Sequence, residues 1–300
     1  MVISWVGGGF LLTLPQKFAE MKHLFVIIAL LGACFSATAF AEVDTLCEED
    51  PYVILMGEAD SAIVRQDWPE AAARLRDALA VKPNHPSNVL LLNNLAAVYS
   101  NMDMDSLSLA TYDQALEIAP AMLTVVTGRA RQLLKMRRDY EAFDAFSDAI
   151  AIDSTCIEAR FYHGMMALYG GNQAVAEQDF AVLQRMVPGS IDTAIALSSL
   201  YALTGRDREA VPYLRFLTEN DPQAEYYAQL AGCHLQLGDL NEASDVIGRG
   251  LERFPDDPEL YYYRAWLNRD RYLMDAARAD AARALQLGAS PQRVAALFAN

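Results

Sequence analysis

Basic residues and cysteines are both scarce in this chain. Its 300 residues include 24 Lys and Arg against 39 Asp and Glu, which gives a formal net charge of −15. A nucleic-acid-binding protein needs a basic face, so DNA and RNA are not expected as partners. Four cysteines, at widely separated positions, are too few for the disulfide framework of a small secreted domain.

Glycine and proline are also uncommon, with 16 and 12 residues, whereas 53% of the chain is hydrophobic. This composition excludes a collagen-like or disordered chain, and it is sufficient to build a large folded core.

Motifs for catalysis or metal binding are missing as well. His85, His163 and His234 are far apart in the sequence, and none belongs to an HExxH motif or accompanies paired cysteines. There is no GxSxG motif, and Gly170-Gly171-Asn172 falls in a predicted turn between helices rather than in a phosphate loop. We therefore expect neither an enzyme nor a bound cofactor.

The N-terminal residues resemble a bacterial export signal. Met21-Lys22-His23 begin a positively charged region, an apolar stretch follows, and Ala39-Phe40-Ala41 has the small-x-small pattern that signal peptidase requires. We predict a signal peptide over residues 21–41, cleaved before Glu42, and an exported protein of the periplasm or cell envelope. Residues 1–20 precede a complete signal, so we interpret them as a start-site extension upstream of Met21.

Two alternatives to cleavage remain open. The apolar stretch over residues 24–41 is almost long enough to span a membrane, so it could persist as an anchor. Leu31-Gly32-Ala33-Cys34 resembles a lipobox, in which Cys34 would be acylated and become the first residue of a membrane lipoprotein. Each alternative still exports the protein from the cytoplasm.

A period of about 34 residues runs through the rest of the chain. Small residues recur with steps of 37, 34, 34, 34, 33 and 34, at Ala71, Ser108, Ala142, Ala176, Ala210, Ala243 and Ala277. Another small residue stands twelve places before each of these anchors, and proline stands twelve places after five of them. Between the anchors, apolar residues recur at i, i+3, i+4 and i+7, as in amphipathic helices. The period accommodates two helices and two short turns.

Each repeated position has a physical role. Small anchors let two helices approach closely, and the prolines end the second helix of each pair. Gly205 and Gly238 are expected to take the left-handed conformation that closes a first helix, and Asp207 and Asp239 to act as N-caps of the following helix. Bulky residues four places after the anchors are expected to fill the space between helices: Leu75, Tyr112, Phe146, Phe180, Leu214 and Ile247.

These positions resemble the tetratricopeptide repeat family. The best match is residues 191–222, with Leu197, Ser198, Tyr201, Gly205, Ala210 and Pro222 at the family's characteristic positions. The resemblance implies an all-α, right-handed solenoid of about seven helix-turn-helix repeats over residues 52–290, after a linker over 42–51. The predicted units lie near 52–85, 89–122, 123–156, 157–190, 191–223, 224–257 and 258–290.

Units three and seven depart from this pattern, and the C-terminal residues extend it. Ser154 and Ala289 replace the terminal proline of units three and seven, and Arg137 and Tyr272 replace their turn glycine. Residues 291–300 are predicted to form a C-terminal capping helix that begins with Ser290 and Pro291. A hydrophobic helix at this end could instead mediate dimerisation, so the oligomeric state stays open.

The resemblance also implies where a partner would bind. First helices of the family line a concave groove, to which the second, fifth, ninth and twelfth residues of each unit contribute. The candidate partner-binding residues are Asn93, Arg131, Phe161, Met165, Tyr262, Trp266 and Arg269. An aromatic residue beside a charge is typical of binding hot spots, although Tyr262 and Trp266 could equally pack between helices.

Two groups of charged residues have a structural and a functional interpretation. The second positions of units four to seven are all acidic, at Glu158, Asp192, Glu225 and Glu259. A line of carboxylates favours a basic peptide, but first-turn acids also stabilise helix dipoles, which we take as their expected role. The basic residues of unit three are expected to form a solvated helix face: Arg129, Arg131, Lys135, Arg137 and Arg138.

The sequence therefore predicts a non-enzymatic scaffold of the cell envelope that binds a protein or peptide segment in the groove. The family's clamp for chaperone tails needs lysines on the first groove helix, and residues 52–64 contain none. One alternative is a lipid-anchored assembly factor, which requires acylation of Cys34. Another is a glycan-binding solenoid with Tyr262 and Trp266 as stacking platforms.

Overall fold

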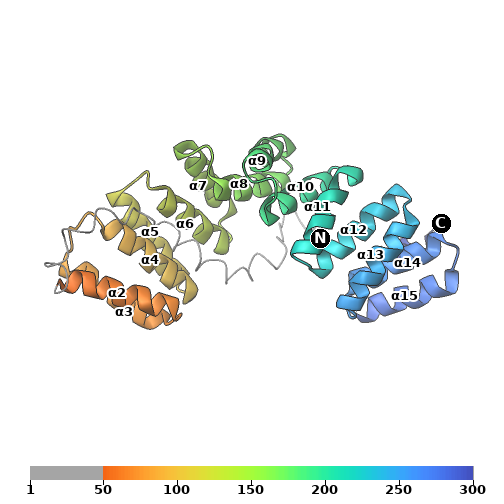
Figure 1. The fold of residues 1–300 in the computed structure, drawn as a ribbon, viewed down its shortest axis with the longest axis horizontal. Coiled ribbons are helices and arrows are strands. Elements are labelled where there is room, and N and C mark those ends of the chain that lie inside the picture. The colour runs from red at the N-terminus through yellow and green to blue at the C-terminus, as the bar shows by residue number, and fades with distance from the viewer. Residues whose placement is uncertain (1–49, 300) are drawn as a thin grey trace. The chain divides into compact units, whose positions relative to one another are not determined.

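The computed structural model describes residues 50–299, and these residues form helices joined by short turns, with no strand among them (Figure 1). The predicted start-site extension, the export signal and the candidate lipidation residue Cys34 lie outside the described residues. None of the described helices is both long and apolar enough to cross a membrane.

The chain divides into two compact units, with the division between Gly170 and Gly171. In the first unit, α2 packs on α3, α4 on α5 and α6 on α7, and α4 also contacts α6. Its helices are α2 (Pro51–Val64), α3 (Trp68–Val81), α4 (Asn88–Asn101), α5 (Asp105–Ile118), α6 (Leu123–Lys135), α7 (Asp139–Ile152) and α8 (Ile157–Tyr169).

The second unit continues the same alternation of helices. Here α10 packs on α11, α12 on α13 and α14 on α15, and α12 also contacts α14. Its helices are α9 (Gln173–Met186), α10 (Ile191–Leu203), α11 (Asp207–Asn220), α12 (Ala224–Leu237), α13 (Leu240–Arg253), α14 (Pro258–Asp270), α15 (Met274–Gln286) and α16 (Pro291–Ala296). The predicted all-α fold of repeated helical pairs is confirmed.

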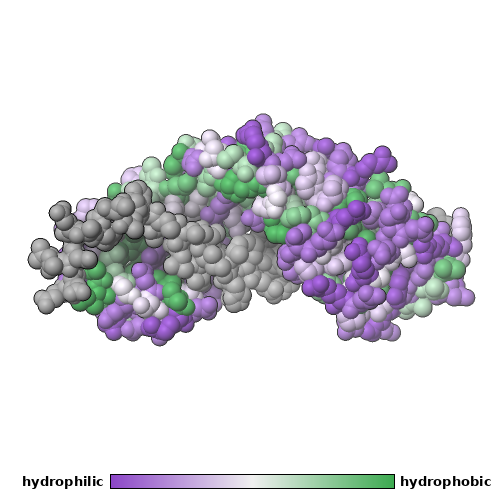
Figure 2. All heavy atoms as spheres, viewed as in Figure 1, coloured by the Kyte–Doolittle hydropathy of each residue, from purple (hydrophilic) through white to green (hydrophobic). Residues whose placement is uncertain are grey.

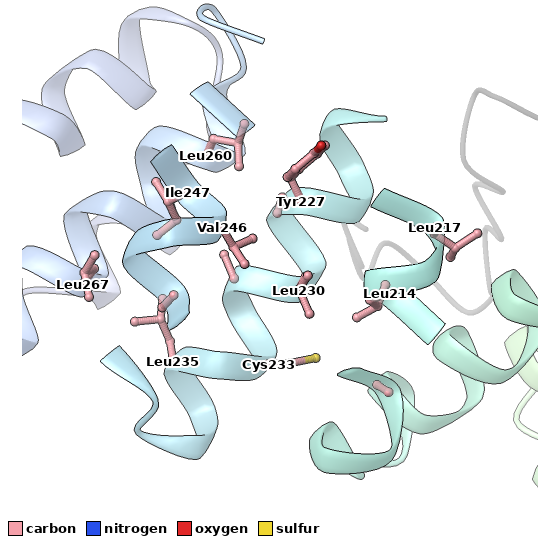
Figure 3. Packing of buried hydrophobic residues seen from close by; sticks show 14 of the residues in the cluster. Leu214, Leu217, Tyr227, Leu230, Cys233, Leu235, Val246, Ile247, Leu260 and Leu267 are labelled. Carbon is pink, nitrogen blue, oxygen red and sulfur yellow. The ribbon is translucent and has the colours of Figure 1, made fainter. Parts of the chain in front are cut away.

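The small anchors lie where the two helices of each pair meet. All seven have no exposed surface: Ala71, Ser108, Ala142, Ala176, Ala210, Ala243 and Ala277. Ser108 satisfies its hydroxyl by donating to the carbonyl oxygen of Ala96, 2.8 Å away. The bulky residues four places later are at most 3% exposed, as predicted. In the second unit, Leu214 and Ile247 pack in a cluster with Leu230 and Leu260 (Figure 3).

Every turn from a first to a second helix contains a residue in the left-handed conformation. Gly205 and Gly238 have φ angles of 69° and 78°, as expected. Non-glycine residues adopt the same conformation in four other turns, at Gln66, Asp103, Arg137 and Tyr272. Left-handed backbone costs such residues about 1–2 kcal/mol each, so helix packing, rather than local preference, sets the turn.

The expected N-cap at Asp207 is wrong, whereas Asp239 occupies the N-cap position of α13 as expected but does not cap it with its side chain. Asp207 is already the first residue of α11, and Asp239 makes no side-chain capping hydrogen bond to α13. Both carboxylates turn towards α12 instead. Asp207 interacts with the thiol of Cys233, whose pKa is raised to about 12, chiefly by burial. Asp239 Oδ2 lies 3.4 Å from Nδ1 of His234.

The second helices end two residues before the repeated prolines, for example α3 before Pro83 and α11 before Pro222. The third pair lacks this proline, yet α7 ends at the equivalent residue, Ile152. Here Asp153 ends the helix instead of a proline. Its Oδ1 accepts hydrogen bonds from both the amide and the hydroxyl of Thr155, at 2.8 and 2.7 Å. Such a local hydrogen bond stabilises a loop conformation and disfavours continuation of the α-helix.

Candidate partner-binding surface

The candidate surface consists of the residues at the second, fifth, ninth and twelfth places of each predicted unit. These places lie on the first helices, and the surface is termed here the first-helix face. In the first unit it belongs to α2, α4, α6 and α8, and in the second unit to α10, α12 and α14. Figure 2 shows mostly hydrophilic side chains over α13 and α15.

In the first unit, two of the predicted residues have accessible polar side chains, and the other two are buried apolar residues. Asn93 of α4 is half-buried and donates to Oδ1 of Asn94 at 3.4 Å. The guanidinium of Arg131 lies 2.8 Å from Glu158 Oε1, which links α6 to α8. Phe161 and Met165 are only 4% and 2% exposed, so a partner can reach little of either side chain.

In the second unit, Tyr262, Trp266 and Arg269 come together along α14. The indole of Trp266 is half-buried and donates to Asp270 Oδ2 at 2.8 Å, while the guanidinium of Arg269 lies 5.7 Å from the indole ring. Tyr262 is 8% exposed. Trp266 and Arg269 therefore lie next to each other with accessible surface, whereas Tyr262 is buried.

The helix α16 covers part of this cluster. Arg293 lies over the ring of Tyr262 at 4.3 Å, and Arg269 donates to the carbonyl oxygen of Leu297 at 3.0 Å. Val294 and Leu297 are buried in the same apolar cluster as Tyr262. Tyr262 is thus not a free platform for a sugar ring, and Trp266 and Arg269 are the parts of this cluster that a partner can reach. That they bind a partner stays a prediction.

The four carboxylates at second positions differ in their partners. Glu158 pairs with Arg131, and Glu259 Oε2 lies 2.6 Å from the guanidinium of Arg293. Among the described residues, Asp192 and Glu225 have no cationic partner, and Glu225 accepts only a hydrogen bond from Gln229 at 3.1 Å. The sequence shows that these positions are acidic but not which of them are neutralised.

The surroundings of Asp192 and Glu225 are electrostatically negative. Burial raises the pKa of Asp192 above its ordinary value. The pKa of Tyr226 is raised as well, first by burial and then by the nearby charges of Asp221, Glu225 and Asp192. Burial penalises the ionised form of Asp192, and for Tyr226 the nearby carboxylates add to the penalty of burial.

We expect Asp192→Asn to stabilise the protein at neutral pH. Because its pKa is raised on folding, the folded state binds more protons than the unfolded state between the two pKa values, so the free energy of unfolding falls as pH rises through that window. The asparagine keeps the shape and removes the charge. Urea unfolding at pH 7 should show a gain that disappears below pH 3, where wild-type Asp192 is protonated in both states.

Asp148→Asn is the matched control, because Asp148 lies on an exposed part of α7 and makes no ion pair or hydrogen bond with the described residues. It should leave the free energy of unfolding almost unchanged at both pH values. A lower stability of Asp192→Asn at pH 7 would show that this carboxylate makes a stabilising contact.

The basic residues of unit three are not simply a solvated face. Arg129 lies 2.7 Å from Asp113, and Lys135 lies 2.7 Å from Asp105. Arg138 pairs with Glu141 at 2.6 Å. With the Arg131–Glu158 pair, these contacts neutralise most of the cluster within the first unit, so it offers little free positive charge to an acidic partner.

His163 and His234 make contacts that stabilise the helix packing. His163 Nε2 lies 3.0 Å from the hydroxyl of Ser147, and its ring stacks on Phe143. His234 is 4% exposed beside Asp239. Within residues 50–299, no three His, Cys, Asp or Glu side chains are grouped so that they could hold a metal ion.

Known proteins share this architecture. The tetratricopeptide repeat family model matches residues 224–267, which include α12, α13 and most of α14. A tetratricopeptide repeat protein from Parabacteroides merdae superposes with a TM-score of 0.60 at 20% identity, covering 83% of this chain and 97% of that one. PilW, a type IV pilus biogenesis factor, has a TM-score of 0.60 at 22% identity, covering 70% and 96%.

A third structure, YrrB, is described as a tetratricopeptide repeat protein with an unusual peptide-binding site. Its TM-score is 0.54 at 18% identity, covering 62% of this chain and 96% of that one. At such identities the likeness is one of fold. Together with the repeat matched at residues 224–267, it shows that the chain has the fold of tetratricopeptide repeat proteins.

Proposed function

We propose that the protein is a non-enzymatic scaffold of the cell envelope that binds a protein or peptide segment on its first-helix face. The repeat fold supports an interaction scaffold, because stacked helical pairs present an extended surface rather than an enclosed cavity. The peptide-binding site named for YrrB supports a peptide as ligand. The export signal predicted at residues 21–41 supports the envelope as location.

The observation that carries the proposal is that polar and aromatic side chains remain accessible on first helices within each of the two units. Asn93 and Arg131 are half-buried on α4 and α6, which are in contact, and Trp266 and Arg269 are half-buried on α14. Half-buried aromatic and arginine side chains can lose their remaining exposed surface to a partner, which is how hot spots gain binding energy.

Site-specific photo-crosslinking in cells tests the binding face. A photoreactive phenylalanine analogue would replace Asn93 or Ser199 on the first-helix face, and Tyr140 or Tyr272 as controls. The two control tyrosines are 91% and 90% exposed at the start of α7 and in the turn before α15, so their replacement does not disturb the core. We expect a shared crosslinked protein from the first pair of sites only. Crosslinks from the control sites alone would place the interface elsewhere.

The N-terminus of the mature protein tests the location. Mass spectrometry of protein purified from fractionated cells should find Glu42 as the first residue, in the periplasmic fraction. An acylated Cys34 in the membrane fraction would instead show a lipoprotein, and an intact residue 21–41 segment in the membrane would show an anchor. Unprocessed protein in the cytoplasm would contradict the envelope proposal.

A further inference from the structure

One side of α2 is exposed although its composition is apolar. Ile54 is 46% exposed and Val64 is 62% exposed, and Gly57 and Ser61 between them are exposed as well. At the helical period these four residues share the side of α2 that lies opposite its buried residues. They are termed here the α2 outer face: Ile54, Gly57, Ser61 and Val64.

In later repeats the same places form the contact with the repeat before. The α2 outer face occupies the third, sixth, tenth and thirteenth places of the first predicted repeat, residues 52–85. At the third place of the third repeat, Val125 is buried in one apolar cluster with Tyr112 of α5. At the tenth place of the second repeat, Val98 is buried with Leu75 of α3. The α2 outer face is therefore a stacking face, and it lacks the polar residues with which a terminal repeat of a soluble solenoid normally ends.

Gly57 leaves an open notch in this face. At the sixth place of the third repeat, a Cβ on Gly128 would stand 2.7 Å from the ring of Tyr112, so glycine there makes room for a side chain of the preceding repeat. Gly57 occupies the sixth place of the first repeat, but a Cβ on it would meet nothing within 4 Å. Glycine inside a helix costs about 1 kcal/mol relative to alanine. No contact within the described chain requires this cost at Gly57.

The α2 outer face is suited to pack on a copy of itself. Gly57 and Ser61 allow two helix backbones to approach closely, and Ile54 and Val64 supply apolar side chains on either side of them. A contact between two identical surfaces needs this kind of self-complementarity.

The charges at the edges of the face also match a second copy. Asp60 lies along one edge and Arg65 along the other; both are exposed, and neither forms an ion pair within residues 50–299. In two parallel helices related by a two-fold axis, Asp60 of each copy faces Arg65 of the other, like the flanking charges of a parallel coiled coil. An antiparallel arrangement would place like charges on the same edge.

We propose that two copies of the protein associate through their α2 outer faces, with the two α2 helices parallel across a two-fold axis. The apolar residues and the notch supply the attraction, whereas the exposed ion pairs set the orientation and add little energy. This inference concerns a different surface from the candidate peptide-binding residues and does not rest on the proposed function.

Other occupants fit this face less well. Residues 42–49, which precede α2 in the predicted mature protein, are acidic at four of eight places, and unpaired carboxylates are costly to bury against apolar side chains. A bilayer surface has no use for a notch of this shape, and anionic lipids repel a chain with a net charge of −15.

Sedimentation velocity of the purified mature protein tests the dimer. We expect the average mass to rise with concentration from that of one chain to that of two. Gly57→Gln should raise the dissociation constant of the dimer by about tenfold or more, because a side chain in the notch holds the two helices apart. The fold should tolerate this change, since a Cβ at Gly57 meets nothing and glutamine favours a helix over glycine.

Gly248→Gln is the matched control. Gly248 is also an exposed glycine inside a helix, α13, and a Cβ on it would meet nothing within 4 Å. This variant should gain helix stability as Gly57→Gln does, but should leave the dissociation constant unchanged within about twofold. Circular dichroism verifies that both variants are folded.

Charge reversal tests the orientation. Asp60→Arg and Arg65→Asp should each weaken the dimer by about fivefold at low salt, because each places like charges opposite one another. The double variant should recover most of the loss, since the two charges then face each other in exchanged order.

The remaining outcomes overturn the inference. A wild-type protein that stays monomeric at every concentration has no such interface, and binding of that monomer to lipid vesicles would assign the face to a membrane. If Gly57→Gln dimerises as well as the wild type, the dimer uses another surface. Assemblies larger than a dimer would contradict a closed two-fold contact, and no recovery in the double variant would contradict the parallel arrangement.

Discussion

Phe146→Ala should lower the free energy of unfolding of the first unit by about 3–5 kcal/mol. Phe146 lies in the middle of α7 with no exposed surface, and its ring stacks on Tyr162 at 5.1 Å between centroids. The cost of such a truncation depends on whether neighbours can move into the space. The apolar cluster around Phe146 contains four fully buried alanines: Ala130, Ala142, Ala149 and Ala159.

Alanines at helix contacts cannot fill the cavity, because their side chains have no freedom to extend and the backbones behind them already meet closely. The loss should therefore be near the upper end of the usual range. Hydrogen exchange followed by mass spectrometry should show the largest loss of protection in α6–α8, with α12–α14 affected less.

Two variants serve as controls. Phe146→Leu keeps most of the volume and should cost less than about 1.5 kcal/mol. Phe143→Ala truncates a half-buried ring on the same helix, stacked on His163 at 4.2 Å, and should cost only about 1–2 kcal/mol. Equal losses for Phe143→Ala and Phe146→Ala would mean that the position in the repeat does not determine the effect.

Positions such as Phe146 could be predicted from sequence because the repeat dictates them. A residue that touches the same neighbours in every unit is subject to the same limit on size, so small and bulky residues recur at fixed offsets. Ala142 and Phe146 are examples, and both are fully buried. The same counting selected Trp266 and Arg269, which are accessible on α14, but also Phe161, Met165 and Tyr262, which are buried.

The sequence could not predict contacts that depend on one unit's particular neighbours. Gln66 and Asp103 adopt the left-handed turn conformation without being glycine, since packing of the flanking helices imposes it. Asp207 is the first residue of α11 rather than its cap, and it interacts with the thiol of Cys233, a neighbour that the repeat does not specify. Arg293 reaches back to Glu259 and Tyr262, which no periodic pattern indicates.

The sequence does indicate one feature that differs between units, the ion pairs between the two helices of a unit. The seventh and twenty-third residues of a unit face each other between its two helices, and in the sixth unit they are Leu230 and Val246, both in the apolar cluster of Figure 3. In the first and seventh units these places carry opposite charges, Glu58 with Arg74 and Arg264 with Asp280. Departures from apolar residues at paired places could thus have predicted both ion pairs.

Arg264→Met, which breaks the ion pair of the seventh unit, should lower the free energy of unfolding by about 2–3 kcal/mol. Arg264 donates to both oxygens of Asp280, at 2.9 and 2.6 Å, and Asn268 donates to Oδ2 at 2.8 Å. The Asp280 side chain is 11% exposed, whereas that of Arg264 is 39% exposed. Removing the arginine leaves a buried carboxylate with one donor, but water can reach the vacated side, so the loss stays below that of a fully buried pair.

A double-mutant cycle separates the pair from its burial cost. Arg264→Met/Asp280→Leu replaces both charges with apolar groups, as Leu230 and Val246 do in the sixth unit, and should recover most of the stability that Arg264→Met loses. As a control, Arg249→Met breaks the Arg249–Asp245 pair of α13, whose side chains are 46% and 67% exposed, and should cost less than about 0.5 kcal/mol. If the double variant is as unstable as Arg264→Met, the arginine contributes through its packing on Tyr261, 4.8 Å away, rather than through the carboxylate.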